Sequence, residues 1–362
     1  MQRVLFVIDQ LASGGAPRSV LKLTRAMLAQ GVSVTLIALS ERLGLDVPEG
    51  AEVRVVPFTP RGRREKLHRY RLHARRLDAF LAEYEASFDL VVANLHQAHQ
   101  VVSRSCLADR AWLCIRSDPR QELLSNKQGW RRRIKRRKVC RLYGNKRLIV
   151  LSETNRHSLA SIGCRPLEVQ VIPNVMELER LQGLMREPIA EPQWAERDFC
   201  LYVGRLAMTQ KRLDRLLRGY LASGTDLPLV LIGDGDRASV EREIRDLGLE
   251  DRVTLLGARA NPYPYMRRAR LLMLSSDYEG LPNVLLEALA CGTPVVSTDC
   301  LSGPSDILQG ELRRGLVPLD DVEAFGAAVS DLLADPPAIP ATIVEPYSPA
   351  SIVARYRALG DG

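Results

Sequence analysis

Short apolar runs alternate with amphipathic stretches along the chain, and their order predicts the fold. VLFVI, at residues 4–8, has the continuous apolar character of a strand that is buried on both faces. A helix is predicted from Pro17 to about Gln30, because proline favours the first helical turn and Gly31 stands where a C-terminal cap is expected. VSVTLIAL then predicts the next strand. This βα order indicates a parallel sheet covered by helices on both faces.

The alternation continues through the first half of the chain and then restarts. Strands are further predicted in AEVRVVPF, LVVANL, AWLCIRS and RLIVLSE, and after the restart in FCLYVGRL, LPLVLIGDGD, RVTLLGAR, RLLMLSS and TPVVSTD. A chain of 362 residues is long for a single core, so two domains are expected. We predict an α/β protein with two doubly wound, Rossmann-like domains, residues 1–173 and 174–345, that face each other across a cleft. Residues 346–362 are predicted to form a helix that packs back on the first domain.

The composition narrows the class of protein. A hydrophobic fraction of 46% and a charged fraction of 26% are typical of soluble globular proteins, and no apolar run is long enough to span a bilayer. The seven cysteines are odd in number and lack the spacing of metal ligands. These features predict a cytoplasmic protein that has neither a disulfide framework nor a structural zinc site.

The charge is distributed unevenly. Residues 1–173 contain 31 Lys and Arg against 15 Asp and Glu, a net charge of +16, whereas the remainder has a net charge of −8. The positive charge is concentrated in Arg61–Arg76 and in Trp130–Arg147, and the second run also contains apolar side chains. Two interpretations stay open: solvated helix faces, or attraction to an anionic membrane surface on the inner face of the cytoplasmic membrane. Neither run matches a nucleic-acid-binding motif, so nucleic acid is not an expected partner.

The stretch DYEGLPNVLLEALACGTPVV has the most specific pattern in the sequence. Glu279 is predicted in the loop after a strand, and Glu287 is predicted inside a helix that starts near Pro282. The amino end of that helix would present backbone N–H groups near Leu281 and Asn283 to a phosphate. Two carboxylates could accept hydrogen bonds from sugar hydroxyls. The pattern therefore favours a nucleotide-sugar site, the alternative being two solvated acids.

Two other predicted strand ends have matching chemistry. FCLYVGRLAMTQKRL ends a strand at Gly204 and continues with Arg205 and, six residues later, Lys211. Two fixed cations near one cleft would neutralise a diphosphate and stabilise the charge that develops on it as a glycosidic bond breaks. Gly233 and Gly235, in LVLIGDGD, allow a close backbone approach at another strand end. Taken separately, these residues are more often surface cations and a tight turn.

Taken in order, the motifs GGAPRS, VGRL…QK, LIGDGD, VTLLG and EGLPNVLLEALACGTPVVSTD resemble the retaining glycosyltransferases of family 4, of the bacterial polysaccharide and lipopolysaccharide type, which have the GT-B fold. The resemblance covers nearly the whole chain. It implies transfer of a sugar, without metal or other cofactor, from a UDP- or GDP-linked donor to the hydroxyl of a glycan or glycolipid acceptor. The residues that it implies in donor binding are Gly14, Gly15, Gly204, Arg205, Lys211, Gly233, Gly235, Glu279, Gly280, Leu281, Asn283 and Glu287.

The resemblance also implies catalytic roles for some of these residues and reveals one departure. Arg205 and Lys211 would hold the diphosphate, and Glu279 would face the transferred sugar. Many relatives carry a histidine at the end of the strand WLCIRSDPR, where this chain has Arg116. His96, in VVANLHQAHQ, is a further catalytic candidate, because it follows a predicted strand and could serve the acceptor.

Two rival functions stay open. An inverting or double-displacement sugar transferase on the same fold would need a catalytic side chain in the first domain, for which Asp9, His96 and Asp118 are the candidates. A protein of a different class, a polyanion-binding module without catalysis, would depend on the two basic runs alone.

Overall fold

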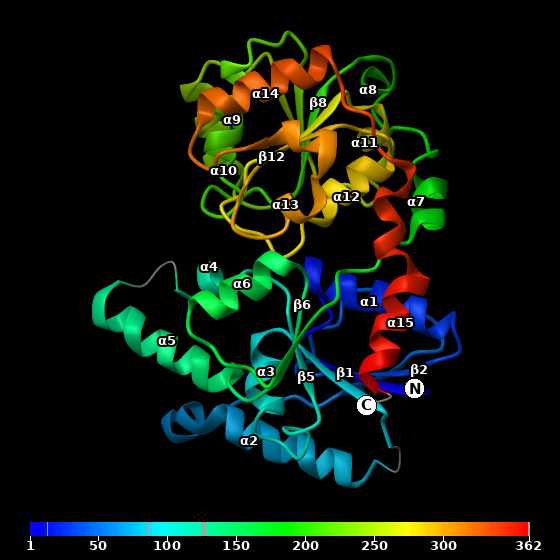
Figure 1. Cartoon of the computed structure of the whole chain (residues 1–362), viewed down its shortest axis with the longest axis vertical. Coiled ribbons are helices and arrows are strands. Elements are labelled where there is room, and N and C mark those ends of the chain that lie inside the picture. Colours follow the sequence, from blue (N-terminus) through cyan, green and yellow to red (C-terminus); the bar gives the residue numbers. More distant parts are fainter. Residues whose placement is uncertain (13, 85–86, 125–127, 361–362) are drawn as a thin grey trace. The chain divides into compact units, whose positions relative to one another are not determined.

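The computed structural model describes residues 1–12, 14–84, 87–124 and 128–360. Within these residues the chain divides into two compact units (Figure 1). Unit 1 contains Met1–Val175 together with Tyr347–Gly362, and unit 2 contains Met176–Pro346. Residues 361 and 362, the last two of the segment predicted as the C-terminal helix, lie outside the described residues.

Unit 1 is built on a parallel sheet. Over the described residues its strands follow the order β3-β2-β1-β4-β5-β6-β7, and each of these neighbouring pairs is parallel. The central strand β4 is buried along its whole length, as expected for a strand covered by helices on both faces. The strands are β1 (Arg3–Ile8), β2 (Ser33–Ala38), β3 (Glu52–Val55), β4 (Leu90–Asn94), β5 (Trp112–Ile115), β6 (Arg147–Val150) and β7 (Glu168–Val171).

The helices of unit 1 come from both ends of the chain. The last helix packs beside the first: the Arg357 guanidinium donates to the Gln30 carbonyl at 2.8 Å, and the Gln30 side chain donates to the Pro349 carbonyl at 3.2 Å. The helices are α1 (Gly15–Leu28), α2 (Arg63–Ala82), α3 (His96–Val102), α4 (Pro119–Leu124), α5 (Gly129–Tyr143), α6 (Glu153–Ser161) and α15 (Pro349–Gly360).

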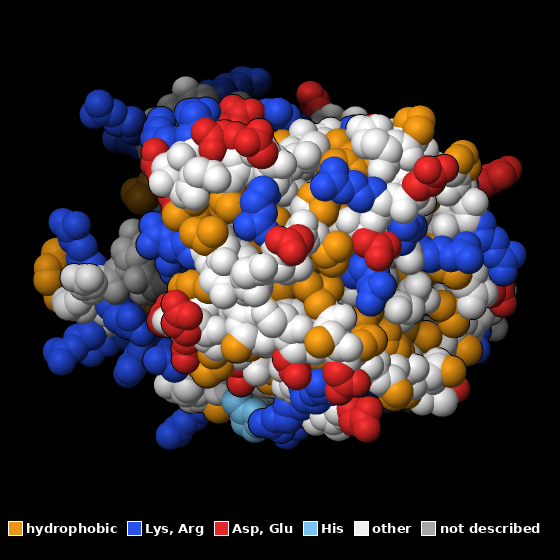
Figure 2. Space-filling model, turned by 90° about the horizontal axis from the view of Figure 1, so that it is seen from above, with side chains coloured by type: hydrophobic (Ala, Val, Ile, Leu, Met, Phe, Trp, Pro, Cys, Tyr) orange, Lys and Arg blue, Asp and Glu red, His pale blue; other side chains and the backbone are white. Residues whose placement is uncertain are grey.

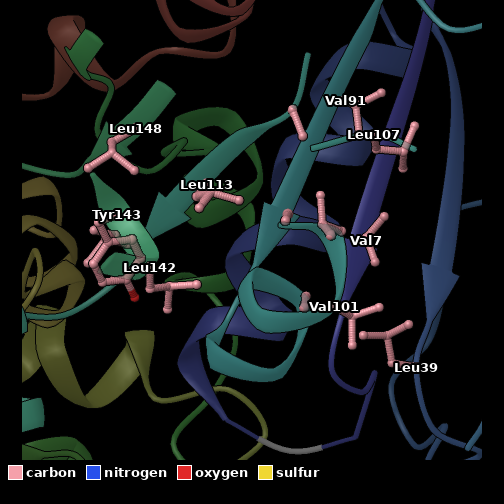
Figure 3. Packing of buried hydrophobic residues seen from close by; sticks show 14 of the residues in the cluster. Val7, Leu39, Val91, Val101, Leu107, Leu113, Leu142, Tyr143 and Leu148 are labelled. Carbon is pink, nitrogen blue, oxygen red and sulfur yellow. The ribbon is translucent and has the colours of Figure 1, made fainter. Parts of the chain in front are cut away.

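A single cluster of apolar side chains forms much of the core of unit 1 (Figure 3). Val7, Val91, Leu113 and Leu148 come from β1, β4, β5 and β6, and Val101 comes from α3; each is at most 1% exposed. Burying a side chain of this size stabilises the fold by about 1.5–3 kcal/mol. Helices α2 and α5 also contribute side chains to this cluster, which attaches both helices to the sheet.

Unit 2 repeats the same architecture on a parallel sheet. Among its described residues the strand order is β10-β9-β8-β11-β12-β13. The strands are β8 (Cys200–Val203), β9 (Leu229–Ile232), β10 (Val253–Gly257), β11 (Leu271–Leu274), β12 (Val295–Thr298) and β13 (Leu316–Val317). The helices are α7 (Leu178–Leu184), α8 (Pro192–Glu196), α9 (Leu213–Ala222), α10 (Arg237–Asp246), α11 (Tyr263–Arg268), α12 (Asn283–Ala290), α13 (Pro304–Ile307) and α14 (Val322–Ala334), with 3-10 turns at Gly310–Gly315 and Ala341–Tyr347.

The predicted fold class, two doubly wound α/β domains, is confirmed. In each sheet the strand order reverses at one point, between β1 and β4 in unit 1 and between β8 and β11 in unit 2. Ligands of such sheets bind at the carboxyl ends of the strands that flank this point. The candidate residues lie in those loops: Asp9 follows β1, His96 follows β4, Arg205 follows β8, and Glu279 follows β11.

Gly233 marks a position where this architecture has no room for a side chain. A Cβ atom built there would lie 1.7 Å from the Gly204 carbonyl oxygen, which is backbone and cannot move aside locally. We expect Gly233→Ala to destabilise unit 2 by about 3 kcal/mol or more. This loss lowers the thermal midpoint by at least about 5 °C for a unit of this size.

The matched control is Gly183→Ala in α7, where a Cβ atom meets nothing within 4 Å. Alanine is favoured over glycine in a helix, so the midpoint of this variant stays at or slightly above that of the wild type. Equal midpoints for both variants, measured by circular dichroism, would contradict the packing described for Gly233.

Candidate active site

Lys211 and Glu279 form an ion pair at the carboxyl edge of the unit 2 sheet. Lys211 stands two residues before α9, and Glu279 lies in the loop between β11 and α12. Lys211 Nζ is 2.5 Å from Glu279 Oε1, and the Ser276 hydroxyl donates to the same oxygen at 2.6 Å. The two side chains are 15% and 10% exposed, so the pair is mostly removed from water. In such surroundings each charge depends on the other for compensation.

Polar contacts join the two loops that carry this pair. The Ser275 hydroxyl donates to the Lys211 carbonyl at 2.8 Å, and the Asp277 N–H donates to the Gln210 carbonyl at 2.8 Å. The buried Arg215 guanidinium donates to the Ser275 carbonyl at 2.9 Å and forms an ion pair with Asp277 at 2.9 Å. The position of the lysine relative to the glutamate is therefore set by the backbone around both.

Arg205 lies close to the same loops and is exposed. Its Nη2 atom is 2.5 Å from Gln210 Oε1, and the Gln210 amide donates to the Tyr278 carbonyl at 3.2 Å, next to Glu279. The Tyr202 hydroxyl, at the end of β8, donates to the Arg205 carbonyl at 2.8 Å. Gln210 thus connects the exposed cation to the loop that holds the buried carboxylate.

Three of the glycines predicted in donor binding, Gly204, Gly233 and Gly235, lie where the loops after β8 and β9 meet. Gly204 donates to the last carbonyl of β9 at 3.0 Å, and Leu206 donates to the Asp234 carbonyl at 2.7 Å. A Cβ atom on Gly235 would lie 2.3 Å from the Leu206 carbonyl oxygen. Gly235 and Gly233 therefore allow two backbone segments to approach each other.

The start of α12 carries the remaining donor-binding residues that were predicted in unit 2. Gly280 and Leu281 are buried, and no side chain caps the helix. The Asn283 N–H donates to the Leu281 carbonyl at 2.9 Å. Glu287, one turn into the helix, accepts a hydrogen bond from the Tyr263 hydroxyl at 3.3 Å.

Some residues of this arrangement were not predicted from the sequence. Ser276 bonds Glu279, Gln210 bonds Arg205, and Tyr263 bonds Glu287. The position of Ser276 gives a usable signal, because residues just after a parallel strand lie at the carboxyl edge of the sheet. The pairing of Lys211 with Glu279 has no local signal, since 68 residues separate them.

In unit 1, Asp9 and Asp118 are engaged at the starts of helices. Asp9 accepts from the Ala98 N–H at 2.6 Å and from the Gln97 N–H at 3.1 Å, at the start of α3. Burial raises the Asp9 pKa from 3.8 to about 6, although these two hydrogen bonds act in the opposite direction. Asp118 accepts from the Gln121 N–H at 2.8 Å in α4, and burial likewise raises its pKa.

The glycine pair and the histidines of unit 1 have different surroundings. Gly14, at φ 113°, precedes α1, and Gly15 begins that helix; both are exposed. His99 is buried, and its Nε2 atom lies 3.2 Å from the Ala93 carbonyl oxygen, so it connects α3 to β4. His96 is the first residue of α3 and lines a cavity of about 180 Å³, to which Arg116 also contributes.

Two family models match this chain. The model described as Glycosyltransferase Family 4 matches residues 13–180, and the model described as Glycosyl transferases group 1 matches residues 197–335. Each model covers less than half of the chain, and together they identify it as a glycosyltransferase of the family 4 type. The resemblance drawn from the sequence motifs is therefore confirmed, and this glycosyltransferase is an enzyme.

Relatives and solved structures agree with this assignment. The glycosyltransferase is 33% identical to the lipopolysaccharide 1,6-galactosyltransferase of Escherichia coli, over 44% of this chain and 47% of that protein. It is 26% identical to N-acetylgalactosamine-N,N'-diacetylbacillosaminyl-diphospho-undecaprenol 4-alpha-N-acetylgalactosaminyltransferase of Campylobacter jejuni, over 92% of this chain and 91% of that protein. The crystal structure of Anabaena HepE in complex with UDP and glucose has the same fold, with a TM-score of 0.74, 18% identity and 99% coverage of both chains. The match with an uncharacterized glycosyltransferase of Methanocaldococcus jannaschii spans only 37% of that protein's length.

The raised pKa of Asp9 makes the stability of unit 1 dependent on pH. Between about pH 4 and pH 6 the folded state binds more protons than the unfolded state, so stability falls as the pH rises through this window. The rise of the Asp9 pKa from 3.8 to about 6, at about 1.36 kcal/mol per pKa unit, corresponds to a change of at most about 3 kcal/mol in the free energy of unfolding. We expect the thermal midpoint of Asp9→Asn, relative to that of the wild type, to rise by several degrees as the pH is raised from 4 to 6.5. A difference that stays constant over this range, measured by differential scanning calorimetry, would show that Asp9 does not titrate there.

Proposed function

We propose that this glycosyltransferase transfers a sugar from a nucleotide-diphosphate sugar, UDP- or GDP-linked, to a hydroxyl of a glycan or glycolipid acceptor. The transfer retains the anomeric configuration and needs no metal ion. It serves the synthesis of lipopolysaccharide or another cell-envelope polysaccharide, a role supported by the names of the relatives from Escherichia coli and Campylobacter jejuni.

The observation that carries the proposal is the pairing of Lys211 with Glu279 beside Arg205. Departure of a nucleoside diphosphate leaves negative charge on phosphate oxygens, and preorganised cations stabilise that charge best. The contacts of Lys211 and Arg205 with neighbouring loops hold both cations at one strand edge. Because Glu279 already compensates the charge of Lys211, Arg205 and the amino end of α12 supply most of the positive charge that a metal ion would otherwise provide.

We assign the other contacts with the donor to loops at the same carboxyl edge of the unit 2 sheet. Gly280, Leu281 and Asn283 stand at the start of α12, where the positive end of the helix dipole favours a phosphate. Glu287 lies one turn further and would accept a ribose hydroxyl. The loop with Gly233 offers main-chain atoms to the nucleobase. A uridine donor has support from Anabaena HepE, whose structure contains UDP and glucose.

Retention of the anomeric configuration is consistent with the hydrogen bonding of the acidic side chains in unit 1. In a same-face transfer, an oxygen of the departing phosphate takes the proton of the acceptor hydroxyl, and no separate base is needed. The inverting alternative needs such a base. Both oxygens of Asp9 accept hydrogen bonds from backbone N–H groups at a helix start, which favours a structural role for Asp9. His96 and Asp118, whose Oδ2 atom is buried without a hydrogen-bond partner among the described residues, are the remaining candidates for that alternative.

Nucleotide binding tests the proposal directly. Arg205→Ala removes an exposed side chain, so the variant should fold, yet we expect UDP or GDP to bind about 10- to 100-fold more weakly, since a charge-assisted hydrogen bond is lost. The control is Arg218→Ala, whose guanidinium pairs with Glu243 on the surface of the same unit. Isothermal titration calorimetry gives both affinities. A non-catalytic polyanion-binding module would bind no nucleoside diphosphate preferentially, and Arg205→Ala would then behave like the control.

The proposal extends to an anionic membrane surface. Helix α5 contains eight Lys and Arg and no acidic residue, and only its C-terminal part is anchored, through Val139, Leu142 and Tyr143. Trp130 and Ile134, in its first half, are 67% and 43% exposed. Basic side chains project at the left edge of Figure 2, the side on which α5 is drawn in Figure 1. Exposed apolar side chains among cations suit an interface with anionic lipid.

Helix α2 adds to the same kind of surface. It contains seven Lys and Arg against two acidic residues, and Leu67 is 80% exposed. In the part of the chain that the structure describes, no helix combines the length and apolar character of a transmembrane span. Any membrane contact through α2 and α5 would therefore be peripheral, which is how an enzyme could reach a glycolipid acceptor.

Vesicle flotation tests this contact. We expect the double variant Trp130→Ser, Ile134→Ser to bind phosphatidylglycerol-containing vesicles at least about tenfold more weakly, because both apolar side chains leave the interface. The control is Leu167→Ser, which removes a 66% exposed side chain elsewhere on unit 1. Equal binding to vesicles with and without phosphatidylglycerol would rule out the electrostatic part of the proposal.

A further inference from the structure

A guanidinium without an acidic partner lines the cavity next to α3. Arg116 follows β5, and its Nε atom donates to Asn94 Oδ1 at 2.9 Å while Nη1 donates to Asn174 Oδ1 at 2.8 Å. Both asparagines are buried. Among the described residues, no carboxylate forms an ion pair with Arg116. Two neutral amides therefore fix the orientation of the cation, but they do not neutralise its charge.

His96 adds a second donor to the same cavity. The Arg104 guanidinium donates to Gln100 Oε1 at 2.8 Å, which fixes the orientation of the Gln100 amide. Gln100 Nε2 then faces His96 Nε2 at 3.4 Å, and an amide nitrogen can only donate. In the neutral imidazole the proton must consequently sit on Nδ1. This atom is buried and has no hydrogen-bond partner among the described residues.

The imidazole is neutral for a physical reason. Burial lowers the pKa of His96, and the positive charges of Lys135, Arg69 and Arg104 lower it further. The cations around the cavity also attract negative charge. His99, on another wall, is neutral too, because burial lowers its pKa to about 3. Its Nε2 atom faces two carbonyl oxygens, so its Nδ1 atom accepts from the Tyr143 hydroxyl.

We propose that this cavity of about 180 Å³ binds an anionic group, a phosphate or a carboxylate, through the guanidinium of Arg116 and the Nδ1–H of His96. No acidic residue is among those that line it in the described structure. A buried donor without an acceptor is costly, and an oxyanion supplies acceptors to both donors at once. A guanidinium is also well matched to the planar pair of oxygens of a carboxylate or phosphate.

The anion belongs to the acceptor, and this part of the inference rests on the proposed function. Unit 2 has its own cations, Lys211 and Arg205, for the diphosphate of the donor. The cavity lies in unit 1, at the carboxyl ends of β4 and β5. It would select acceptors that carry a phosphate or an acidic sugar.

Calorimetric titration with inorganic phosphate tests the cavity in the full chain. Saturating UDP or GDP is added so that the anion site of unit 2 is filled, and phosphate is expected to bind under this condition. In Arg116→Gln we expect phosphate affinity to fall at least about tenfold, and in His96→Ala at least about threefold, in line with the loss of a charged and a neutral hydrogen bond. Nucleotide affinity should stay unchanged in both variants.

The matched control is Arg110→Gln, which removes an exposed arginine that also donates to a neutral oxygen, the Phe88 carbonyl. Arg116→Lys provides a second variant that keeps the charge but loses the planar fork, and an intermediate affinity is expected. Thermal midpoints report whether each variant is folded. Phosphate affinity that is the same in Arg116→Gln, Arg116→Lys and wild type would overturn the proposal.

Competition distinguishes the two sources of the anion. If UDP or GDP displaces the phosphate that depends on Arg116, the cavity holds a donor group and the assignment to the acceptor is overturned. The same phosphate titration in Arg205→Ala, without nucleotide, measures phosphate binding in the cavity while the donor site of unit 2 is weakened. Failure of the proposed function would appear in the wild type, as intact phosphate binding without any specific binding of UDP or GDP.

Discussion

A lysine and a glutamate that are both largely removed from water set the conditions for the unit 2 site. Each ion loses several kcal/mol of hydration free energy on burial, and the loss is offset only if the partner stays within contact distance. The contacts around Lys211 and Glu279 serve this requirement: Ser276 bonds the carboxylate, and Ser275 holds the lysine backbone. Because these loops are fixed before any substrate arrives, little reorganisation is needed when charge develops on a leaving group.

The same side-chain chemistry takes different roles in unit 1 because the partners differ. Asp9 has an elevated pKa, a property often found in catalytic acids, yet both of its oxygens bond to the start of a helix. Arg116 has the opposite situation, since its partners are neutral amides. In unit 1, α3 therefore holds the carboxylate of Asp9, whereas the charge of Arg116 is not neutralised by its partners.

Sequence patterns were sufficient for the fold class and for the edge of each sheet where chemistry is concentrated. Apolar runs of four to six residues identify buried parallel strands such as β1, and the residues that follow them must lie at the carboxyl edge. The pattern fails for β7, whose alternating polar residues reflect a strand at the edge of its sheet, and for β13, which has two residues. It also fails for contacts such as that of Asp9 with α3, because that contact depends on β1 and β4 being neighbours.

The return of α15 to unit 1 has a consequence for how the protein is made. Ile352, Val353 and Tyr356 are buried in a unit whose other residues end at Val175. A ribosome synthesises all of unit 2 before the helix that completes unit 1 emerges. During that interval the nascent first unit keeps the apolar surface that α15 will cover in contact with water or with a chaperone. Unit 2, whose residues are contiguous, can complete its own core earlier, so the part of the chain that is translated second is the first that can finish folding.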